Sequence, residues 1–173
     1  MSRTLSELSE ALKSTRGRSI PIHVGEVMTR DVVTLSPQHS FHEAIALIAR
    51  YRFRHLVVAD AEKCLVGVLS DRDLLRFMVR EPRWDATTVA EVMKTDPQTV
   101  RADTLLSTAT AEMLTQRINC LPVVNEHGRV EGIVTSTDLL RAFHNVQEQL
   151  EHLETANLAE QNTVPSATGK ESG

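Results

Sequence analysis

The chain contains one pattern twice, at a fixed offset of 65 residues. When residues 24–76 are shifted by that offset, they align with residues 89–141 without a gap. A constant period shows that a chain consists of several copies of one unit rather than one irregular domain. The sequence therefore predicts two copies of a unit of about 53 residues. The clearest identities are Glu-Val-Met at 26–28 and 91–93, glycine at 67 and 132, and Asp-Leu-Leu-Arg at 73–76 and 138–141.

Neither copy is long enough to be stable by itself. A unit of about 60 residues buries only about 60% of the surface that its unfolded chain exposes. The whole chain has 173 residues, of which 41% are hydrophobic, a normal proportion for a protein with a buried core. We therefore expect the two copies to pack on each other.

Each copy predicts the order strand, helix, strand, strand, helix, which is an α/β fold of the α+β type. Ser40 followed by Glu43 has the spacing of a helix capping box, and that helix should end near Tyr51. Residues 125–128 supply turn chemistry that the first copy lacks. The other segments expected in the first copy are a helical turn at 24–28, strands at 32–35, 56–58 and 65–69, and a helix at 71–80. Those of the second copy are a strand at 99–100, a helix at 105–116, strands at 121–124 and 130–134, and a helix from 136.

Further segments flank and link the copies. Apolar residues continue at helical spacing from Leu139 to Leu153, so the last helix should extend beyond its repeat. This apolar seam either packs on its own domain or contacts a second copy. We expect an N-terminal helix and linker at 1–22, repeats at 23–80 and 89–145, a linker at 81–88, a helical extension at 146–160 and a disordered tail at 161–173.

Charge and hydropathy exclude several classes of protein. The net charge is −4 and the basic residues are scattered, so we expect no nucleic-acid partner. There is no signal-peptide pattern, and no apolar run approaches the roughly 18 residues that span a bilayer. We therefore expect a soluble, cytoplasmic protein with no membrane partner.

The residues offer neither a catalytic constellation nor a metal site. Cys64 and Cys120 are isolated from each other and should be reduced thiols. His39 and His42 share a helix start but lack a third ligand. Nothing matches a nucleophile with its base, a Walker loop or a GxGxxG fingerprint. We predict that the protein is not an enzyme and holds no metal.

Four kinds of segment, each present twice, resemble a known family. They are the Val-Met openings at 27–28 and 92–93, the segments at Thr34 and Thr99, the apolar runs at 56–58 and 121–124, and the closing stretches at 67–74 and 132–139. Together they resemble the cystathionine-β-synthase (CBS) domain, and the pair resembles the tandem called a Bateman module. The resemblance implies that the repeats pack about a pseudo-two-fold axis. It also implies two clefts between them for adenosine-containing ligands.

The resemblance identifies Asp73 and Asp138 as the carboxylates that would accept hydrogen bonds from a ribose. Each follows a hydroxyl residue, Ser70 or Thr135, by three positions. The same spacing is that of a capping box, in which both side chains bind backbone amides without any ligand, and the two roles can coexist. By resemblance, the backbone around Thr34 and Thr99 would bind the adenine edge. Candidate walls, which could equally be plain core, are Val58, Val68, Val123 and Ile133.

The two clefts should differ in their affinity for phosphate. Arg54 and His55 precede the middle strand of the first copy, whereas the equivalent positions of the second hold asparagine and cysteine. By resemblance these basic residues would reach across to the cleft of Thr135 and Asp138, which we hypothesise to be the better phosphate site. The cleft of Ser70 and Asp73 would depend on Arg72 or on backbone amides. The alternative for Arg54 is a solvated surface charge.

These expectations define a stand-alone regulatory module for signal transduction. It would sense AMP, ADP or ATP, or a related adenosyl ligand such as S-adenosylmethionine, and no cofactor would be required. The alternative is a scaffold module whose clefts are empty and whose role is oligomerisation. By resemblance we expect a homodimer of modules and a downstream protein partner that the sequence does not identify.

Overall fold

The computed structural model describes residues 22–81, 84 and 86–161. The predicted N-terminal helix and the predicted tail beyond residue 161 lie outside the described residues. The first copy forms α2 (Val24–Val27), β1 (Thr34–Leu35), α3 (Phe41–Tyr51), β2 (His55–Ala59), β3 (Leu65–Ser70) and α4 (Asp71–Arg80). The second forms α5 (Val89–Val92), β4 (Lys94–Thr95), α6 (Leu106–Gln116), β5 (Cys120–Val124), β6 (Val130–Thr135) and α7 (Ser136–Gln161). The α/β fold class predicted from the two repeats is confirmed.

The helix limits follow from local hydrogen bonding. The Ser40 N–H donates to the Glu43 carboxylate (2.7 Å), and the Glu43 N–H donates to Oγ of Ser40 (3.2 Å). This is the predicted capping box, and it satisfies backbone donors that the first turn leaves without partners. At the other end, Arg52 takes a left-handed φ of 55° and stops α3, and Arg117 does the same after α6 with a φ of 54°.

Each copy builds a small sheet around a central hairpin. In the first sheet β1 runs parallel to β2, β2 is antiparallel to β3, and β3 is antiparallel to β4. In the second sheet β5 and β6 form the hairpin, and the outer positions are reduced to isolated bridges at Val100 and Thr29. The strand predicted at 99–100 is therefore a single bridge, and β4 was not predicted.

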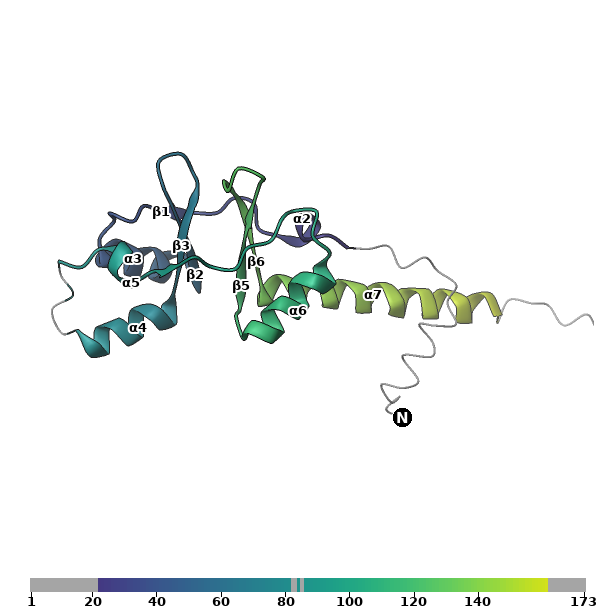
Figure 1. Ribbon diagram of the computed structural model, residues 1–173. Helices are drawn as coiled ribbons and strands as arrows, with labels where there is room; N and C mark the ends of the chain where they lie inside the picture. Colours follow the sequence, from purple (N-terminus) through teal and green to yellow (C-terminus); the bar gives the residue numbers. More distant parts are fainter. Residues whose placement is uncertain (1–21, 82–83, 85, 162–173) are drawn as a thin grey trace, which may run out of the picture.

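The opening segment of each copy packs with the other copy. The Val24 N–H donates to the Thr104 carbonyl (2.9 Å), and at the same offset of 65 the Val89 N–H donates to the His39 carbonyl (2.8 Å). In Figure 1, α2 accordingly lies with α6 and α7, while α5 lies with α3 and α4. Hydrogen bonds between the copies occur in pairs related by the repeat offset, which is the signature of a pseudo-two-fold axis.

In the hydrophobic cores too, the opening segment of each copy packs in the other copy; we call this the exchange of opening segments. Val24 and Met28 are buried in the core built on α6, β5 and β6. Val89 is fully buried in the core built on α3, β2 and β3. A third cluster of Val57, Cys120 and Ile133 joins the two sheets. Neither copy therefore has a complete core without the other, as its short length predicts.

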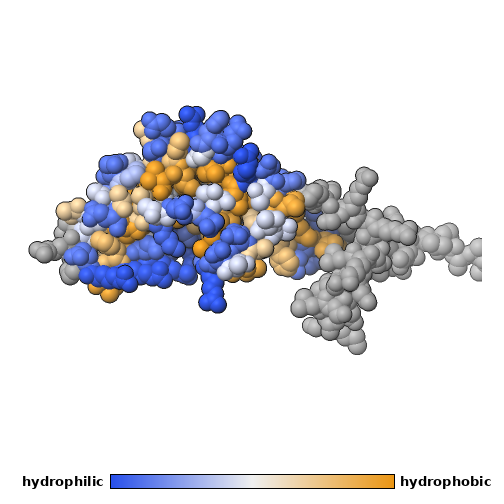
Figure 2. All heavy atoms as spheres, in the orientation of Figure 1, coloured by the Kyte–Doolittle hydropathy of each residue, from blue (hydrophilic) through white to orange (hydrophobic). Residues whose placement is uncertain are grey.

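The two hairpins meet at the pseudo-two-fold axis. Cys64 and Arg129, which are related by the offset of 65, bridge to each other. The turns next to them are alike, because Lys63 and Gly128 at equivalent positions take left-handed φ angles of 64° and 75°. The first copy thus makes the same turn without a glycine. Figure 1 shows the hairpins side by side, and Figure 2 shows hydrophilic side chains over their tips.

The last helix, α7, packs against the core of its own repeat only at its start. Leu139 packs against the core of the second copy. Further along, Phe143, Val146 and Leu150 are 60%, 39% and 40% exposed, so the described residues cover the later part of the apolar seam only in part. The side chain of Leu153 lies outside the described residues. Within the described part of the chain, no helix combines the length and apolarity needed to cross a membrane.

Two glycines allow the copies to approach each other. A Cβ at Gly67 would lie 2.6 Å from the Lys94 carbonyl oxygen, and one at Gly132 would lie 2.7 Å from that of Thr29. In each case a methionine side chain of the exchanged opening segment, Met93 or Met28, lies within 3 Å of the same point. Backbone atoms cannot move aside as a flexible side chain can, so both positions require glycine.

We expect Gly67→Ala and Gly132→Ala each to lower the free energy of unfolding by about 1–3 kcal/mol, because the added methyl group overpacks the junction. Urea denaturation would measure it. Glu131→Ala, next to Gly132 but exposed, is the control and should change stability by less than about 0.5 kcal/mol. A glycine variant as stable as this control would contradict the close approach.

Candidate functional site

Two clefts lie at equivalent places in the two copies. The first has a volume of about 360 Å³ and the second about 370 Å³. The first cleft is lined by residues 54–55, 68, 70–73, 76, 94–98 and 116–120. The second cleft is lined by residues 29, 31–33, 52–55, 119, 133, 135–138 and 141. Shifting most of one lining by 65 positions gives the other, so the clefts are pseudo-symmetric counterparts.

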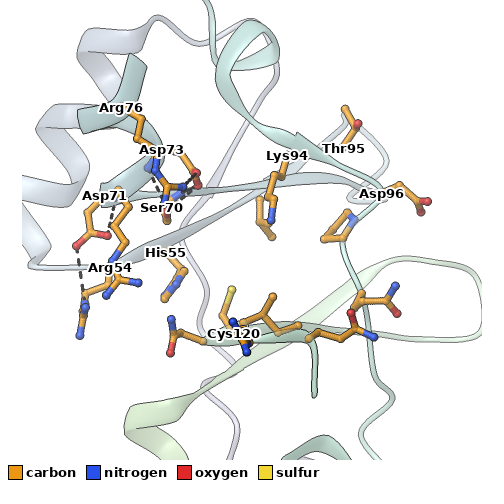
Figure 3. A pocket seen from close by; sticks show the side chains of 18 residues that line it. Arg54, His55, Ser70, Asp71, Asp73, Arg76, Lys94, Thr95, Asp96 and Cys120 are labelled. Atoms are coloured by element: carbon orange, nitrogen blue, oxygen red, sulfur yellow. Dashed lines mark hydrogen bonds and ion pairs between the residues drawn. The ribbon is translucent and has the colours of Figure 1, made fainter. Parts of the chain in front are cut away.

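Each cleft is built from both copies. The first receives the start of α4 and the end of β3 from the first copy, and β4 with the end of α6 from the second. Figure 3 shows this arrangement, with Ser70, Asp73 and Arg76 on one side, Lys94 and Asp96 on another, and Cys120 opposite them. A molecule bound in either cleft would therefore contact both repeats.

The predicted ribose carboxylates cap their helices with one oxygen. Oδ2 of Asp73 accepts from the backbone N–H (3.0 Å) and the hydroxyl of Ser70. Oδ2 of Asp138 accepts from the N–H (2.8 Å) and the hydroxyl (2.7 Å) of Thr135. Both carboxylates thus have the capping role that the sequence offered as an alternative. Each keeps Oδ1 outside the capping interaction.

The second carboxylate oxygen lies beside an arginine in both clefts. Oδ1 of Asp73 is 3.7 Å from Nη1 of Arg76, and Oδ1 of Asp138 is 3.3 Å from Nη1 of Arg141. Both guanidinium groups are on exposed side chains, whereas the side chain of Asp138 is only 5% exposed. A carboxylate oxygen accepts more than one hydrogen bond, so Oδ1 can receive a ligand hydroxyl without loss of the cap.

The start of β2 lies between the clefts. Arg54 and His55, which the resemblance assigns to the second cleft, line both clefts. Arg54 is held on the first side, where its Nε lies 3.8 Å from Oδ2 of Asp71. The Arg54 side chain is 63% exposed, so this ion pair is weak and the side chain can reach either cleft.

The environment of the central strands keeps two cleft residues uncharged. Burial is the main cause of a lowered His55 pKa, which Arg54 and Arg72 lower further and which Asp71 and Asp73 partly restore. His55 is therefore neutral at pH 7. Burial also raises the pKa of Cys120, at the equivalent position, to about 12, with Asp73 adding to the effect. Neither residue brings charge to a phosphate at neutral pH.

Some of the other predicted site residues line a cleft and some do not. Ser70, Arg72 and Asp73 line the first cleft, and Thr135 and Asp138 line the second. Thr34 and Thr99 line neither cleft, because the lining segments end one residue earlier, at Val33 and Gln98. Among the candidate walls, the cleft-lining residues are Val68 and Ile133, while Val58 and Val123 are fully buried in the cores.

The sequence reasoning missed most of the cations. Arg76 and Arg141 occur in both closing signatures, one helical turn after the aspartates, and that repetition was a usable signal. Arg52 and Arg117 lie where the left-handed residues end α3 and α6. Lys94 reaches the first cleft only because its segment crosses to the other copy. The first cleft therefore has more cations than the hypothesis about the second cleft assumed.

The histidines at the start of α3 have other partners. Nδ1 of His39 accepts from the Ser36 N–H (2.7 Å), and His42 stacks on Trp84 with ring centroids 4.7 Å apart. Across residues 22–81, 84 and 86–161, no three histidine, cysteine, aspartate or glutamate side chains come together to hold a metal ion.

Comparison with known proteins identifies both repeats. The family described as "CBS domain" matches residues 24–80 and again residues 89–145. The chain is 34% identical over 122 residues to arabinose 5-phosphate isomerase KpsF of Escherichia coli, covering 70% of this chain and 37% of the isomerase. It is 32% identical over 116 residues to inosine-5′-monophosphate dehydrogenase of Methanocaldococcus jannaschii, covering 67% of this chain and 22% of the dehydrogenase. The chain thus spans well under half the length of these enzymes.

Solved structures match over nearly their whole length. A putative acetoin utilization protein, AcuB, from Vibrio cholerae has a TM-score of 0.70 and 33% identity, covering 77% of this chain and 98% of that one. CBSX2 in complex with AMP has a TM-score of 0.67 and 30% identity, covering 72% and 98%. A CBS domain pair in complex with 5′-methylthioadenosine and S-adenosyl-L-methionine has a TM-score of 0.67 and 26% identity, again covering 72% and 98%.

The His55 pKa predicts a pH dependence of stability. An unfolded histidine takes up a proton below about pH 6.5, whereas the partly buried His55 resists protonation until the pH is lower. The unfolded state therefore binds more protons in that window, and the free energy of unfolding falls as the pH drops from 7 toward 5. We expect His55→Asn to show a shallower fall in urea denaturation across this range. If the free energy of unfolding falls equally steeply with pH in both proteins, the lowered pKa of His55 is contradicted.

Proposed function

We propose that this chain, which belongs to the CBS-domain family as a tandem pair, binds an adenine nucleotide or related adenosyl ligand in its two clefts and acts as a regulatory module. The observation that carries the proposal is that Asp73 and Asp138 each cap a helix with one carboxylate oxygen and keep the other beside an arginine. A ribose needs a hydrogen-bond acceptor and a phosphate needs a cation, and each cleft has both. The AMP and S-adenosylmethionine complexes of similar domain pairs support the same ligand class.

The ribose, the base and the phosphate of such a ligand would each contact a different kind of side chain in the clefts. Vicinal ribose hydroxyls would donate to Oδ1 of Asp73 or Asp138, as acidic residues hold ribose in dinucleotide sites. The apolar base would lie against Val68 in the first cleft and Ile133 in the second. Arg54 would supply forked, charge-assisted hydrogen bonds to phosphate. ADP, ATP and S-adenosylmethionine share the adenosyl part and differ only in the group next to these cations.

Regulation would follow from the position of the clefts between the copies. A ligand that contacts both repeats favours the arrangement in which its contacts are complete, and it shifts the population toward that arrangement by its differential affinity. A downstream protein partner would respond to that change. The chain would supply no chemistry of its own in this role.

Association with a second copy is the other part of the proposal. Leu75 and Val79 on α4 are 63% and 86% exposed, and Leu140 and Phe143 on α7 are 68% and 60% exposed. Leu75 and Leu140 are equivalent positions of the two repeats. Both helices begin on the side of the molecule opposite the hydrophilic hairpin tips (Figure 1). A homodimer of modules would cover both apolar faces.

Nucleotide titration of wild type and Arg54→Ala tests the ligand site. We expect AMP affinity to fall about two- to fivefold, because an exposed ion pair is lost, while adenosine affinity stays the same. Isothermal titration calorimetry would measure both. Arg101→Ala, which removes an exposed arginine that lines neither cleft, is the control and should retain AMP affinity. Equal losses for AMP and adenosine would refute a phosphate role for Arg54.

A thermal-shift panel separates the sensor from the scaffold alternative. Binding to the native state alone raises the melting temperature, so AMP, ADP, ATP, adenosine or S-adenosylmethionine should stabilise the protein at millimolar concentration. If none of the five does so, the clefts do not bind this class and oligomerisation is the better account of the module.

Substitution of the helix faces tests the homodimer. We expect light scattering to give twice the chain mass for wild type and the single-chain mass for Val79→Glu combined with Phe143→Glu, because the buried carboxylates would lack partners. Leu114→Glu, on the exposed face of α6, is the matched control and should remain dimeric. A monomeric wild type would exclude this assembly.

A further inference from the structure

The two clefts differ in charge at positions that the repeat makes comparable. Arg76 and Arg141 are equivalent, as are Arg117 and Arg52, so both clefts have these guanidinium groups. Three other positions differ in charge. Arg72 of the first cleft corresponds to Thr137 of the second, Lys94 corresponds to Thr29, and Asp71, which pairs with Arg54, corresponds to Ser136.

The first cleft therefore has the larger positive charge. Five arginine and lysine residues and three aspartates line it, whereas three arginines and two aspartates line the second. Arg54 belongs to both linings, and Asp71 of the first cleft already pairs with it. His55 lines both clefts and is neutral at pH 7. The unshared cations thus favour anions in the first cleft.

The cations of the first cleft lie on several walls. Arg72 and Arg76 are on α4, Lys94 is on β4, and Arg117 follows α6. Figure 3 shows Lys94 across the cavity from Arg54, with Arg76 on the α4 side. A single phosphate can contact only some of these cations, because they lie on different walls. A chain of two or three phosphates could contact several walls at once.

A groove next to the first cleft continues the positive helix face. It shares Asp73 and Arg76 with the cleft and adds Arg80, two helical turns after Arg72, on the α4 side and Glu91 on the opposite side. Residues four apart lie on one face of a helix, so Arg72, Arg76 and Arg80 form a row along α4. The equivalent row on α7 is Thr137, Arg141 and Asn145, with a single cation.

We propose that the first cleft is a site for a nucleoside di- or triphosphate, and that the second cleft holds a nucleoside monophosphate or an uncharged adenosyl group. This inference rests on the proposed function, since it assigns ligands within those two clefts. It reverses the expectation that the second cleft is the better phosphate site. Lys94 and Arg72 are the residues that would give the first cleft its preference for the longer phosphate chain.

The repeat itself supplies the variants that test this assignment. Arg72→Thr with Lys94→Thr gives the first cleft the residues of the second, and Thr29→Lys with Thr137→Arg does the reverse. All four side chains belong to exposed residues, so the fold should tolerate both exchanges. Far-UV circular dichroism and the melting temperature without ligand would verify that it does.

Calorimetric titrations with ADP and with AMP give the decisive ratio of affinities. In wild type we expect the stronger ADP site to prefer ADP to AMP, and the double threonine variant to lose about tenfold in ADP affinity but only about twofold in AMP affinity. The reverse variant should gain a second site that prefers ADP. The preference should weaken as salt is raised from low ionic strength, because exposed charges are screened.

The outcomes separate the inference from the proposed function. If AMP and ADP bind wild type and the double threonine variant with the same ratio of affinities, the assignment of the first cleft is overturned while nucleotide binding stands. If the ratio changes only in the reverse variant, the assignment is likewise overturned. If neither nucleotide nor adenosine binds the wild type, the proposed function fails and the assignment fails with it.

Discussion

The structure depends on the exchange of opening segments between the two copies. Met28 packs over Gly132 and Met93 over Gly67, at distances that only a residue without a side chain allows. Backbone hydrogen bonds on either side of each contact hold the exchanged segments in register. Because each core is completed by residues of the other repeat, the two copies form one folding unit rather than two tethered domains.

The same exchange creates the clefts. The segment that follows each exchanged helix crosses the partner sheet and then lines the cleft at that sheet's edge, opposite a helix start. A ligand there would lie across the junction that stabilises the fold, so its binding would be linked to the packing of the copies. Under the proposed function, this linkage is the physical route by which occupancy of a cleft would change the shape of the module.

The two aspartates that cap helices are also the acceptors of the proposed ribose site. Oδ2 of Asp73 and Oδ2 of Asp138 complete capping interactions that fix the carboxylates at helix starts, and Oδ1 is left for a further partner. A preorganised acceptor loses little side-chain freedom when a hydroxyl arrives, which favours binding. The capping interaction thus leaves room for the proposed ribose contact, in line with the expectation that the two roles can coexist.

The sequence by itself determined the repeat, the order of elements, the capping box at Ser40 and the family, because these depend on local patterns at fixed spacing. It could also place Asp73 and Asp138 at helix starts, since the closing signatures are short and nearly alike. Only the tertiary structure decided which copy each opening segment joins, because the offset of 65 is the same whether a segment packs with its own copy or with the other. For that reason Lys94 was not expected in the first cleft. Arg54 lines both clefts because the start of β2 lies between them, and only the packing of the two sheets decides that. The charge of each cleft is the sum of charges from segments that lie far apart in the chain. A pattern read along one copy does not show which of these segments meet.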